Sequence, residues 1–436
     1  MTLAWAQQSG ALDGGSFDVV VVGAGFAGMY LVKLLRDEGF SVQCIERGSD
    51  VGGTWYWNRY PGARCDVESM QYSYGWDDEL QQDWEWSERF SGQPEILRYA
   101  SHVADKHDLR SSMVFDTAVE TMTFDAAENR WTLTTSREET LQARFCICAT
   151  GCLSEANKPQ QMFSGVDDFI GETFHTGHWP HADRFSGVLE PLEGKRVALI
   201  GNGSSGIQSI PEIAKVASEL VVFSRTPQYS VPAQNQPMDK DYEAFMKANY
   251  KERRALMRAN PGGQILHSNN EAVRERLRVG MQTRTLDWSP EEREAQYQAL
   301  WDEGGFTFYT AFMDAGADPE ANAEMAEFIR GKIRDTVTDP EMAALLSPEN
   351  FVLCKRPVLD SGYFEAFNEP HVKLVPLEGS TSEEPKPGAS SIAGITKNGV
   401  RMEDSREFEV DVIVFAIGYD AMTGAILNID VSGTKF

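Results

Sequence analysis

Short continuous runs of apolar residues, each followed by a glycine-rich turn and then an amphipathic stretch, occur twice in this 436-residue chain. The first run is the β-branched stretch Phe17–Val22, followed by the helical pattern Met29–Glu38 and a second predicted strand at Ser41–Ile45. Strands buried on both faces of a parallel sheet have such continuous runs, and strands that alternate with helices indicate βαβ units. The pattern therefore predicts an α/β protein.

The second series begins with Lys195–Ile200, continues into a helix from Ile207, and has its next strand at Leu220–Phe223. After Pro237 the pattern changes to long charged stretches of helical period without strand signals, such as Asp239–Ala259 and Pro319–Thr336. We expect a helical insertion here, embedded in the second α/β unit.

The turn after Phe17–Val22 contains the glycines of a dinucleotide-binding motif, Gly23, Gly25 and Gly28. The first permits a tight turn, the second lets a pyrophosphate approach the backbone, and the third lets helix and strand pack closely. The N-terminus of the following helix offers unpaired N–H groups to the phosphates.

An acid, Glu46, ends the second strand of this unit, about 20 residues downstream, where an acid binds the ribose hydroxyls. This spacing favours an unphosphorylated ribose, as in FAD or NAD. Gly52 and Gly53 follow, where the chain again has to run close to a cofactor.

The second series has a matching turn, with Gly201, Gly203 and Gly206 in the motif positions and Ser204 and Ser205 between the last two glycines. Its second strand leads to Ser224, Arg225 and Thr226 instead of an acid. A guanidinium can pair with a 2′-phosphate through two parallel hydrogen bonds, so Arg225 selects NADPH over NADH. We therefore expect two Rossmann-like domains, one for FAD and one for NADPH, with hydride transfer between the cofactors.

Composition excludes several classes of partner, site and cellular location. The formal net charge of −26 repels phosphates, so a nucleic-acid partner is not expected. The six cysteines have neither a C-x-x-C pair nor zinc spacing, which disfavours a disulfide reductase and a structural metal site. The segment before Phe17 lacks the features of a signal peptide and reads as a frayed extension, and no apolar run is long enough to cross a bilayer, so we expect a cytoplasmic protein.

Between the two units, Phe169–Pro180 reads FIGETFHTGHWP, which matches F-x-G-x-x-x-H-x-x-x-W-P. Gly53–Asp66 matches G-x-W-x-x-x-x-[FY]-P-G-x-x-x-D, and Cys354–Pro357 reads CKRP. Taken together, these motifs resemble those of type I Baeyer-Villiger monooxygenases. The resemblance extends from about Phe17 to the end, although family members continue for a sizeable further segment.

The resemblance implies a division of the chain into five segments. Residues 1–160 form the first segment of the FAD-binding domain, 161–234 the first segment of the NADPH-binding domain, and 235–350 the helical insertion. Residues 351–384 return to the NADPH-binding domain, and 385–436, with the strand-like stretch Asp411–Asp420, return to an incomplete FAD-binding domain.

The implied reaction inserts one atom of O2 next to a ketone carbonyl, through a flavin C4a-peroxide, and gives an ester or lactone. Arg356 would be the cation beside the reacting oxygen atoms, oriented by Asp66, and Lys355 would bind the nicotinamide nucleotide. Further cofactor-binding positions are expected at Thr54, Trp55, Tyr60, His175, Trp179 and Thr226. Asp66 and Arg356 are also expected to contact the cofactors.

Two other functions remain open from the sequence. A flavin N- or S-monooxygenase uses the same cofactors, although Trp179-Pro180 and the Lys355-Arg356 pair favour ketone oxidation. The short chain could also be a non-catalytic nucleotide-binding protein. The sequence does not reveal the size of the ketone, the regioselectivity or the oligomeric state.

Overall fold

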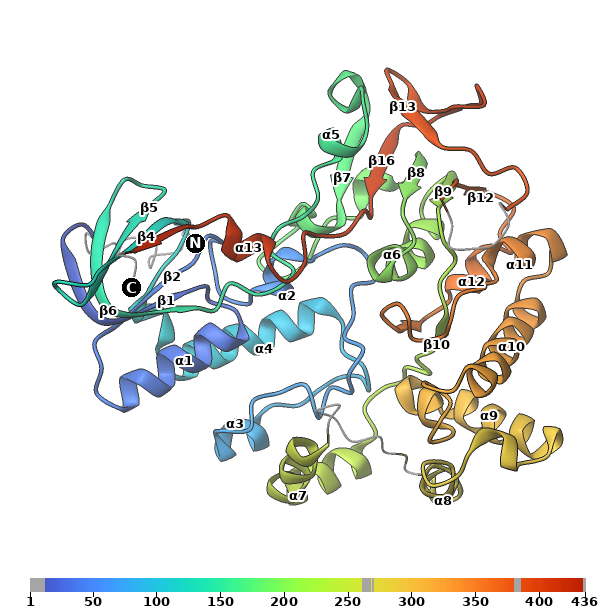
Figure 1. Cartoon of the computed structure of the whole chain (residues 1–436), viewed down its shortest axis with the longest axis horizontal. Helices are drawn as coiled ribbons and strands as arrows, with labels where there is room; N and C mark the ends of the chain where they lie inside the picture. The colour runs from blue at the N-terminus through green and yellow to red at the C-terminus, as the bar shows by residue number, and fades with distance from the viewer. Residues whose placement is uncertain (1–11, 261–267, 269, 380–385, 434–436) are drawn as a thin grey trace.

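The computed structural model describes residues 12–260, 268, 270–379 and 386–433. It contains two α/β units, each built on its own sheet, at opposite ends of the long axis (Figure 1). The predicted fold class is confirmed. Most of the segment before Phe17, which was expected to be a frayed extension, lies outside the described residues.

The first sheet has seven strands in the order β17-β4-β5-β6-β1-β2-β3. The strands are β1 (Gly15–Val22), β2 (Val42–Ile45), β3 (Met113–Val114), β4 (Val119–Asp125), β5 (Arg130–Thr135), β6 (Thr140–Cys148) and β17 (Asp430–Gly433). The central strand β1 is parallel to both of its neighbours, β2 and β6. Val19 and Val21 pack against α1 (Phe26–Asp37) and α4 (Gln93–Lys106), whereas Val20 and Val22 face a second core on the other side. Covering of both faces explains why residues 19–22 are all valine.

The second sheet has five strands, all parallel, in the order β12-β9-β8-β16-β7. They are β7 (Glu172–His175), β8 (Arg196–Ile200), β9 (Glu219–Ser224), β12 (Val372–Pro376) and β16 (Val412–Phe415). One face packs against α6 (Ser204–Ala214) and α12 (Tyr363–Ala366). The other face packs against a small antiparallel sheet of β13 (Ile392–Thr396), β14 (Gly399–Met402) and β15 (Glu407–Glu409).

The placement of β16 differs from one prediction. Residues 385–436 were assigned to the FAD-binding domain, but β16 lies between β8 and β7 in the second sheet, and β13–β15 pack against that sheet. Only the chain after β16 crosses to the first unit, through α13 (Gly424–Leu427) to β17 (Figure 1). A buried run such as VIVF fits the centre of either sheet, and its partners are set by contacts distant in sequence.

In the described part of residues 235–350, the helices are α7 (Lys240–Ala259), α8 (Glu271–Gly280), α9 (Pro290–Glu303), α10 (Pro319–Thr336) and α11 (Pro340–Leu346). Their starts follow from side-chain caps; Ser289, for example, forms a capping box with Glu292. Helices α8 to α11 share the core of the second unit, but Tyr242 and Met246 of α7 are in the core of the first. The packing of α7 therefore differs from the predicted placement of the whole insertion in the NADPH-binding domain.

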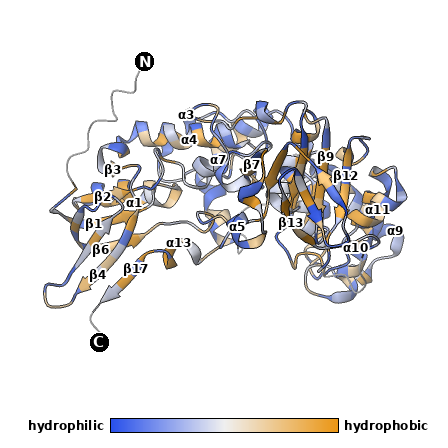
Figure 2. Ribbon diagram, turned by 90° about the horizontal axis from the view of Figure 1, so that it is seen from above, coloured by the Kyte–Doolittle hydropathy of each residue, from blue (hydrophilic) through white to orange (hydrophobic). Residues whose placement is uncertain are grey.

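The described chain also contains shorter elements. Among them are α2 (Thr54–Trp57), α3 (Asp78–Asp83), α5 (Pro159–Met162), and the two-stranded pair β10 (Ser230–Pro232) and β11 (Val358–Asp360). Apolar residues concentrate in the strands of both sheets (Figure 2). Among the described residues, no helix combines the length and apolar character needed to cross a membrane.

Two of the segments that cross between the units run beside each other. Ala156 and Tyr419 form an antiparallel bridge, and backbone hydrogen bonds join Asn157 N to Gly418 O (3.0 Å) and Asp420 N to Glu155 O (2.9 Å). The outgoing chain after β6 and the returning chain after β16 thus form a short paired ribbon.

Candidate functional site

The first glycine turn is packed against the end of β6. Gly23 has a φ of 105°, and a Cβ atom there would lie 2.6 Å from the carbonyl oxygen of Ala149. A Cβ atom on Gly28 would lie 1.8 Å from the carbonyl oxygen of Gly23. Side chains at these two positions would push the turn off the sheet. The motif therefore requires glycine at both.

The loop after β2 crosses this turn at close range. A Cβ atom on Gly53, whose φ is 54°, would lie 2.8 Å from Cα of Gly25. The N–H of Gly52 donates to the carbonyl of Ala24 (3.1 Å). Gly53 therefore has no room for a side chain where the turn and the loop meet, and Gly25 packs directly against it.

A cleft of about 580 Å³ opens above the turn. Of the predicted residues, it is lined by Gly23, Gly25, Glu46, Gly53, Thr54 and Trp55. Its size lies in the range of small-molecule and cofactor sites. Residues that the sequence reading missed also line it, namely Thr117–Glu120 at the start of β4 and Ala425, Asn428 and Ile429 near α13. They share no local motif, because distant segments of chain bring them to the cleft.

Glu46 links the first glycine turn to the loop after β2. Its carboxylate accepts hydrogen bonds from Ala24 N (2.7 Å) and Gly48 N (2.6 Å), and the residue is buried. Burial raises the pKa of Glu46, against the effect of these N–H donors. The position, at the carboxyl end of β2 and on the cleft wall, fits the predicted ribose contact.

The second glycine turn repeats the first. Gly201 also has a φ of 105°, and its Cβ atom would lie 2.4 Å from the carbonyl oxygen of Ala416, the residue after β16. Gly206 packs against Gly201 as Gly28 packs against Gly23, and a Cβ atom on Gly203 would meet nothing within 4 Å. The strand next to each turn thus supplies an alanine as packing partner, and the open side of Gly203 is free for a ligand.

The residues after Gly203 form the N-terminus of α6. Ser204 and Ser205 occupy its first two positions, and the hydroxyl groups of Ser205 and Thr176 lie 3.0 Å apart. The free N–H groups of this helix face the turn and provide an anion site.

Two cations come together at the end of β9. Arg225 is exposed, Thr226 beside it is buried, and Lys355 reaches the same place from the segment before β11. Burial lowers the pKa of Lys355, and the nearby charge of Arg225 lowers it further. Neither cation has an ion pair with a described carboxylate. Two unneutralised cations side by side repel each other and favour a phosphate between them.

The predicted pair of Asp66 and Arg356 is present. Nη2 of Arg356 donates to Oδ2 of Asp66 at 2.9 Å, and this ion pair joins the first unit to the second. The Asp66 side chain is 8% exposed, whereas that of Arg356 is 65% exposed. Burial raises the pKa of Asp66, and the charge of Arg356 acts against this.

The charge of Arg356 acts on two tyrosines of the first unit. It lowers the pKa of Tyr60 and of Tyr72, although burial raises both overall. Tyr72 accepts a hydrogen bond from Nε1 of Trp55 (3.0 Å) and lines the cleft, whereas the hydroxyl of Tyr60 donates to Oε1 of Gln208 on α6 (2.8 Å). Tyr60 therefore joins the two units next to the cation and is not on the cleft wall.

His175 ends β7, and its ring has a fixed tautomer. Nδ1 accepts a hydrogen bond from Gly177 N (2.9 Å), so the proton of the neutral ring is on Nε2, which is buried without a described partner. Burial, helped by His178, lowers the pKa of His175 to about 4. His175 is therefore neutral near pH 7 and offers one N–H donor, which agrees with a positioning role.

Replacing His175 by asparagine, whose amide oxygen can accept from Gly177 N–H, should remove part of the pH dependence of stability. The folded-state pKa is about 4, against an ordinary value of 6.5, so the unfolded chain binds more protons between these values. Wild-type stability therefore falls as the pH drops from 6.5 to 4. The wild-type advantage in free energy of unfolding should be about 1–2 kcal/mol larger at about pH 7.5 than at about pH 4.5. Urea unfolding measures this, and an equal advantage at both pH values would contradict it.

Trp179 is placed differently from its prediction as a cofactor-binding residue. It is 2% exposed, packs against Phe174 with ring centroids 5.1 Å apart, and donates from Nε1 to the carbonyl of Val188 (2.6 Å). A side chain that contacts a cofactor must have free surface when the cofactor is absent. The tryptophan of the linker motif instead fixes the loop after it to the core of the second unit.

The variant Trp179→Phe tests this structural role. It keeps the ring packing but leaves the buried carbonyl of Val188 unpaired, which should lower the free energy of unfolding by about 1–3 kcal/mol. The Michaelis constant for NADPH should stay unchanged, as steady-state kinetics would show. A stable variant with weakened NADPH use would mean that the indole N–H serves the nucleotide.

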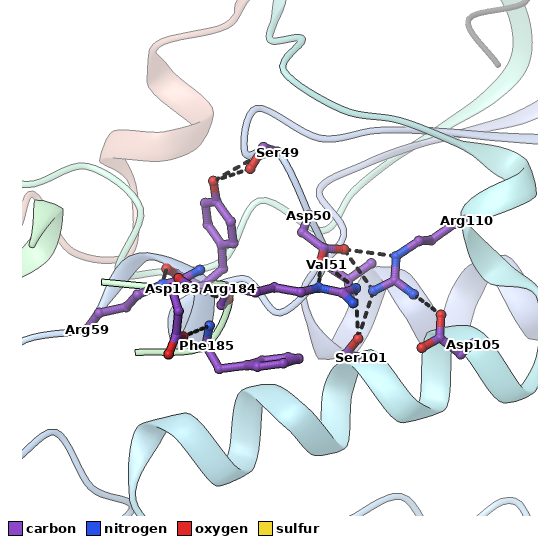
Figure 3. A network of polar contacts seen from close by, with 11 residues as sticks. Ser49, Asp50, Val51, Arg59, Ser101, Asp105, Arg110, Asp183, Arg184 and Phe185 are labelled. Carbon is purple, nitrogen blue, oxygen red and sulfur yellow. Dashed lines mark hydrogen bonds and ion pairs between the residues drawn. The ribbon is translucent and has the colours of Figure 1, made fainter. Parts of the chain in front are cut away.

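The loop after the linker motif is also fixed to the first unit, by a network that the sequence reading missed. Asp50 lies between two arginines, accepting from Nε of Arg110 (2.9 Å) and from Nε and Nη2 of Arg184 (3.0 and 2.9 Å) (Figure 3). Both arginines also bond to Ser101 of α4, and Arg59 donates to the carbonyls of residues 183 and 184. Asp50 belongs to the same loop as Gly53, so the network holds the cleft wall.

Comparison with known proteins agrees with this geometry. Residues 17–244 match the family described as flavin-binding monooxygenase-like. The chain is 40% identical to a Baeyer-Villiger monooxygenase of Pseudooceanicola batsensis and 39% identical to a cyclohexanone 1,2-monooxygenase of an Acinetobacter species, in each case over 96% of this chain and 72% of the relative. Among solved structures, an oxidized steroid monooxygenase bound to NADP is similar, with a TM-score of 0.84, 45% identity, and coverage of 95% of this chain and 74% of that one.

Proposed function

The chain belongs to the Baeyer-Villiger monooxygenases of the flavin-binding monooxygenase-like family, and on this premise we propose that its site converts a ketone and O2 into an ester or lactone with FAD and NADPH. The cofactors follow from the family, and the residues that bind them are our assignment. The observation that carries the proposal is the ion pair of Arg356 and Asp66 between the two nucleotide sites.

We assign FAD to the cleft above the first turn. The bare backbone at Gly25 and Gly53 fits a pyrophosphate, and Glu46 lies at the ribose position. Thr54 and Trp55 line the cleft next to Gly53. The flavin supplies the activated oxygen when it is bound, and this chain has to position it and exclude water.

We assign NADPH to the second turn. The helix start at Ser204 and Ser205 fits the pyrophosphate, and Arg225 with Lys355 fits the 2′-phosphate. An NADH ribose would leave these two cations without a counter-charge.

Arg356 is assigned to the reacting oxygen atoms. One of its nitrogen atoms is held by Asp66, and its exposed part keeps further N–H donors free. A guanidinium fixed in this way stabilises negative charge on an oxygen atom without reorganising during the reaction. The buried carboxylate of Asp66 orients the cation and keeps it charged.

The sheet topology and the core clusters support a revised division of the chain into two domains. We propose that the FAD-binding domain comprises residues 12–158, α7 and the chain after residue 420, and that the NADPH-binding domain comprises residues 159–237, 270–379 and 386–416.

The proposed function is tested on the purified protein. We expect a flavin absorption spectrum, NADPH consumption that increases with ketone, and an ester or lactone identified by mass spectrometry from a panel of cyclic and aryl ketones. Amines and sulfides in the same assay test heteroatom oxidation. Bound flavin with heteroatom oxides but no ester would overturn the ketone assignment, and no bound flavin would overturn the FAD assignment.

A further inference from the structure

We propose that Arg47 and Glu155 form a clasp across the FAD cleft that slows the release of the bound cofactor. The proposal rests on the proposed function, because it requires FAD in this cleft. Neither residue has a part in the oxygenation described above.

The topology places the two residues on opposite sides of the first turn. Strand β1 lies between β2 and β6, and the turn at Gly23 follows β1. Arg47 comes two residues after the end of β2, and Glu155 lies on the segment that leaves β6. Because neighbouring strands are about 4.8 Å apart, the ends of β2 and β6 are separated by roughly 10 Å, with the turn between them. A contact between the two segments therefore spans the side of the cleft above the turn.

The contact is made by one guanidinium with three partners. Nη1 of Arg47 donates to Oε1 of Glu155 (2.5 Å), and Nη2 donates to the carbonyl of Ser154 (2.7 Å). The guanidinium also lies 5.3 Å from the ring centroid of Trp57. All four of these residues line the cleft. The Arg47 side chain is thus held by a hydrogen bond to a carboxylate, a hydrogen bond to a backbone carbonyl and a cation–π contact.

The linker motif covers one flank of the clasp. The ring of His178 meets the ring of Trp57 edge to face, with centroids 5.6 Å apart. Burial lowers the pKa of His178, the charge of Arg47 lowers it further, and Glu155 acts in the opposite direction. The charged groups of the clasp therefore lie within electrostatic reach of a histidine that belongs to the NADPH side.

An ordinary surface ion pair contributes little to folding, and the side chains of Arg47 and Glu155 are 41% and 24% exposed. Because this pair lies across the cleft, we expect it to affect the rate of cofactor release more than the free energy of folding. For a ligand that leaves past this side of the cleft, the contact has to open first, so its opening free energy adds to the barrier for release.

The experiment measures the rate of FAD release from the holoenzyme. Flavin fluorescence is followed after mixing with an excess of an FAD-scavenging apoprotein, for wild type, Arg47→Ala, Glu155→Gln and the double variant. We expect release to be about three- to tenfold faster in each single variant, and the double variant to be no faster than the faster single variant. Wild-type release should accelerate with added salt, and release from the variants should not.

The matched control is Arg144→Ala. Arg144 forms an exposed ion pair with Asp18 at 3.1 Å in the same unit, and neither residue lines the cleft. The Arg144→Ala variant should release FAD at the wild-type rate. Equal rates for wild type and both clasp variants, or multiplicative effects in the double variant, would overturn the clasp. A wild-type protein that is purified without FAD would instead contradict the proposed function.

Discussion

Replacing Arg356 by alanine should reduce ester formation by about 10²–10³-fold while FAD binding and NADPH consumption continue. The guanidinium is the cation that Asp66 fixes at the junction of the two units. It lines neither the FAD cleft nor the glycine turn of the second unit. Without it, the negative charge that develops on oxygen during insertion loses its stabilising partner. The measurement compares the amount of ester formed with the amount of NADPH consumed. We expect the NADPH that is consumed without ester formation to be matched by hydrogen peroxide.

Two further variants make this result specific. Asp66→Asn keeps the hydrogen-bond acceptor but removes its charge, so the loss should be smaller than for Arg356→Ala. Arg334→Ala removes an exposed arginine paired with Glu327 on α10 and should leave product formation unchanged. If Arg356→Ala formed ester at the wild-type rate, the role assigned to this cation would be wrong.

Replacing Arg225 by alanine should raise the Michaelis constant for NADPH by about 10- to 100-fold and leave that for NADH unchanged. The side chain is exposed at the end of β9 and lies near Lys355, and no described carboxylate pairs with it. The two cations therefore have charge available for a 2′-phosphate, which NADH lacks. Steady-state kinetics with both nucleotides measures the ratio.

The matched control for this prediction is Arg278→Ala, because Arg278 is an exposed arginine of α8 that pairs with Glu275. It should change neither Michaelis constant. Equal effects of Arg225→Ala on NADPH and NADH would remove the argument for a phosphate contact and would point to a general effect on the fold of the turn.

Local sequence predicted those features that depend on local physical requirements. Both glycine turns were predictable because their positions exclude side chains, and the structure shows that a Cβ atom on Gly28 or Gly206 would overlap a backbone carbonyl. The contact between Asp66 and Arg356 was predictable only through the resemblance to a family, since 290 positions separate the two residues.

What the sequence did not reveal depends on contacts between distant segments. The apolar pattern of β16 predicts a buried strand but not the sheet that it joins. Trp179 occupies a motif position, yet its burial and its bond to Val188 indicate a structural role. The ion pairs at Asp50 and at Arg47 have no signature in sequence, because charged residues next to a loop are ordinarily solvated.

The paired ribbon between the units has a mechanical consequence. A single connecting chain would let one unit swivel freely about the other. Here the outgoing and returning segments are bonded side by side, through Asn157 to Gly418 and Asp420 to Glu155. Two segments that are hydrogen-bonded side by side can bend together but resist being twisted about each other. The ribbon should therefore resist twisting of the nicotinamide side against the flavin side more than it resists bending.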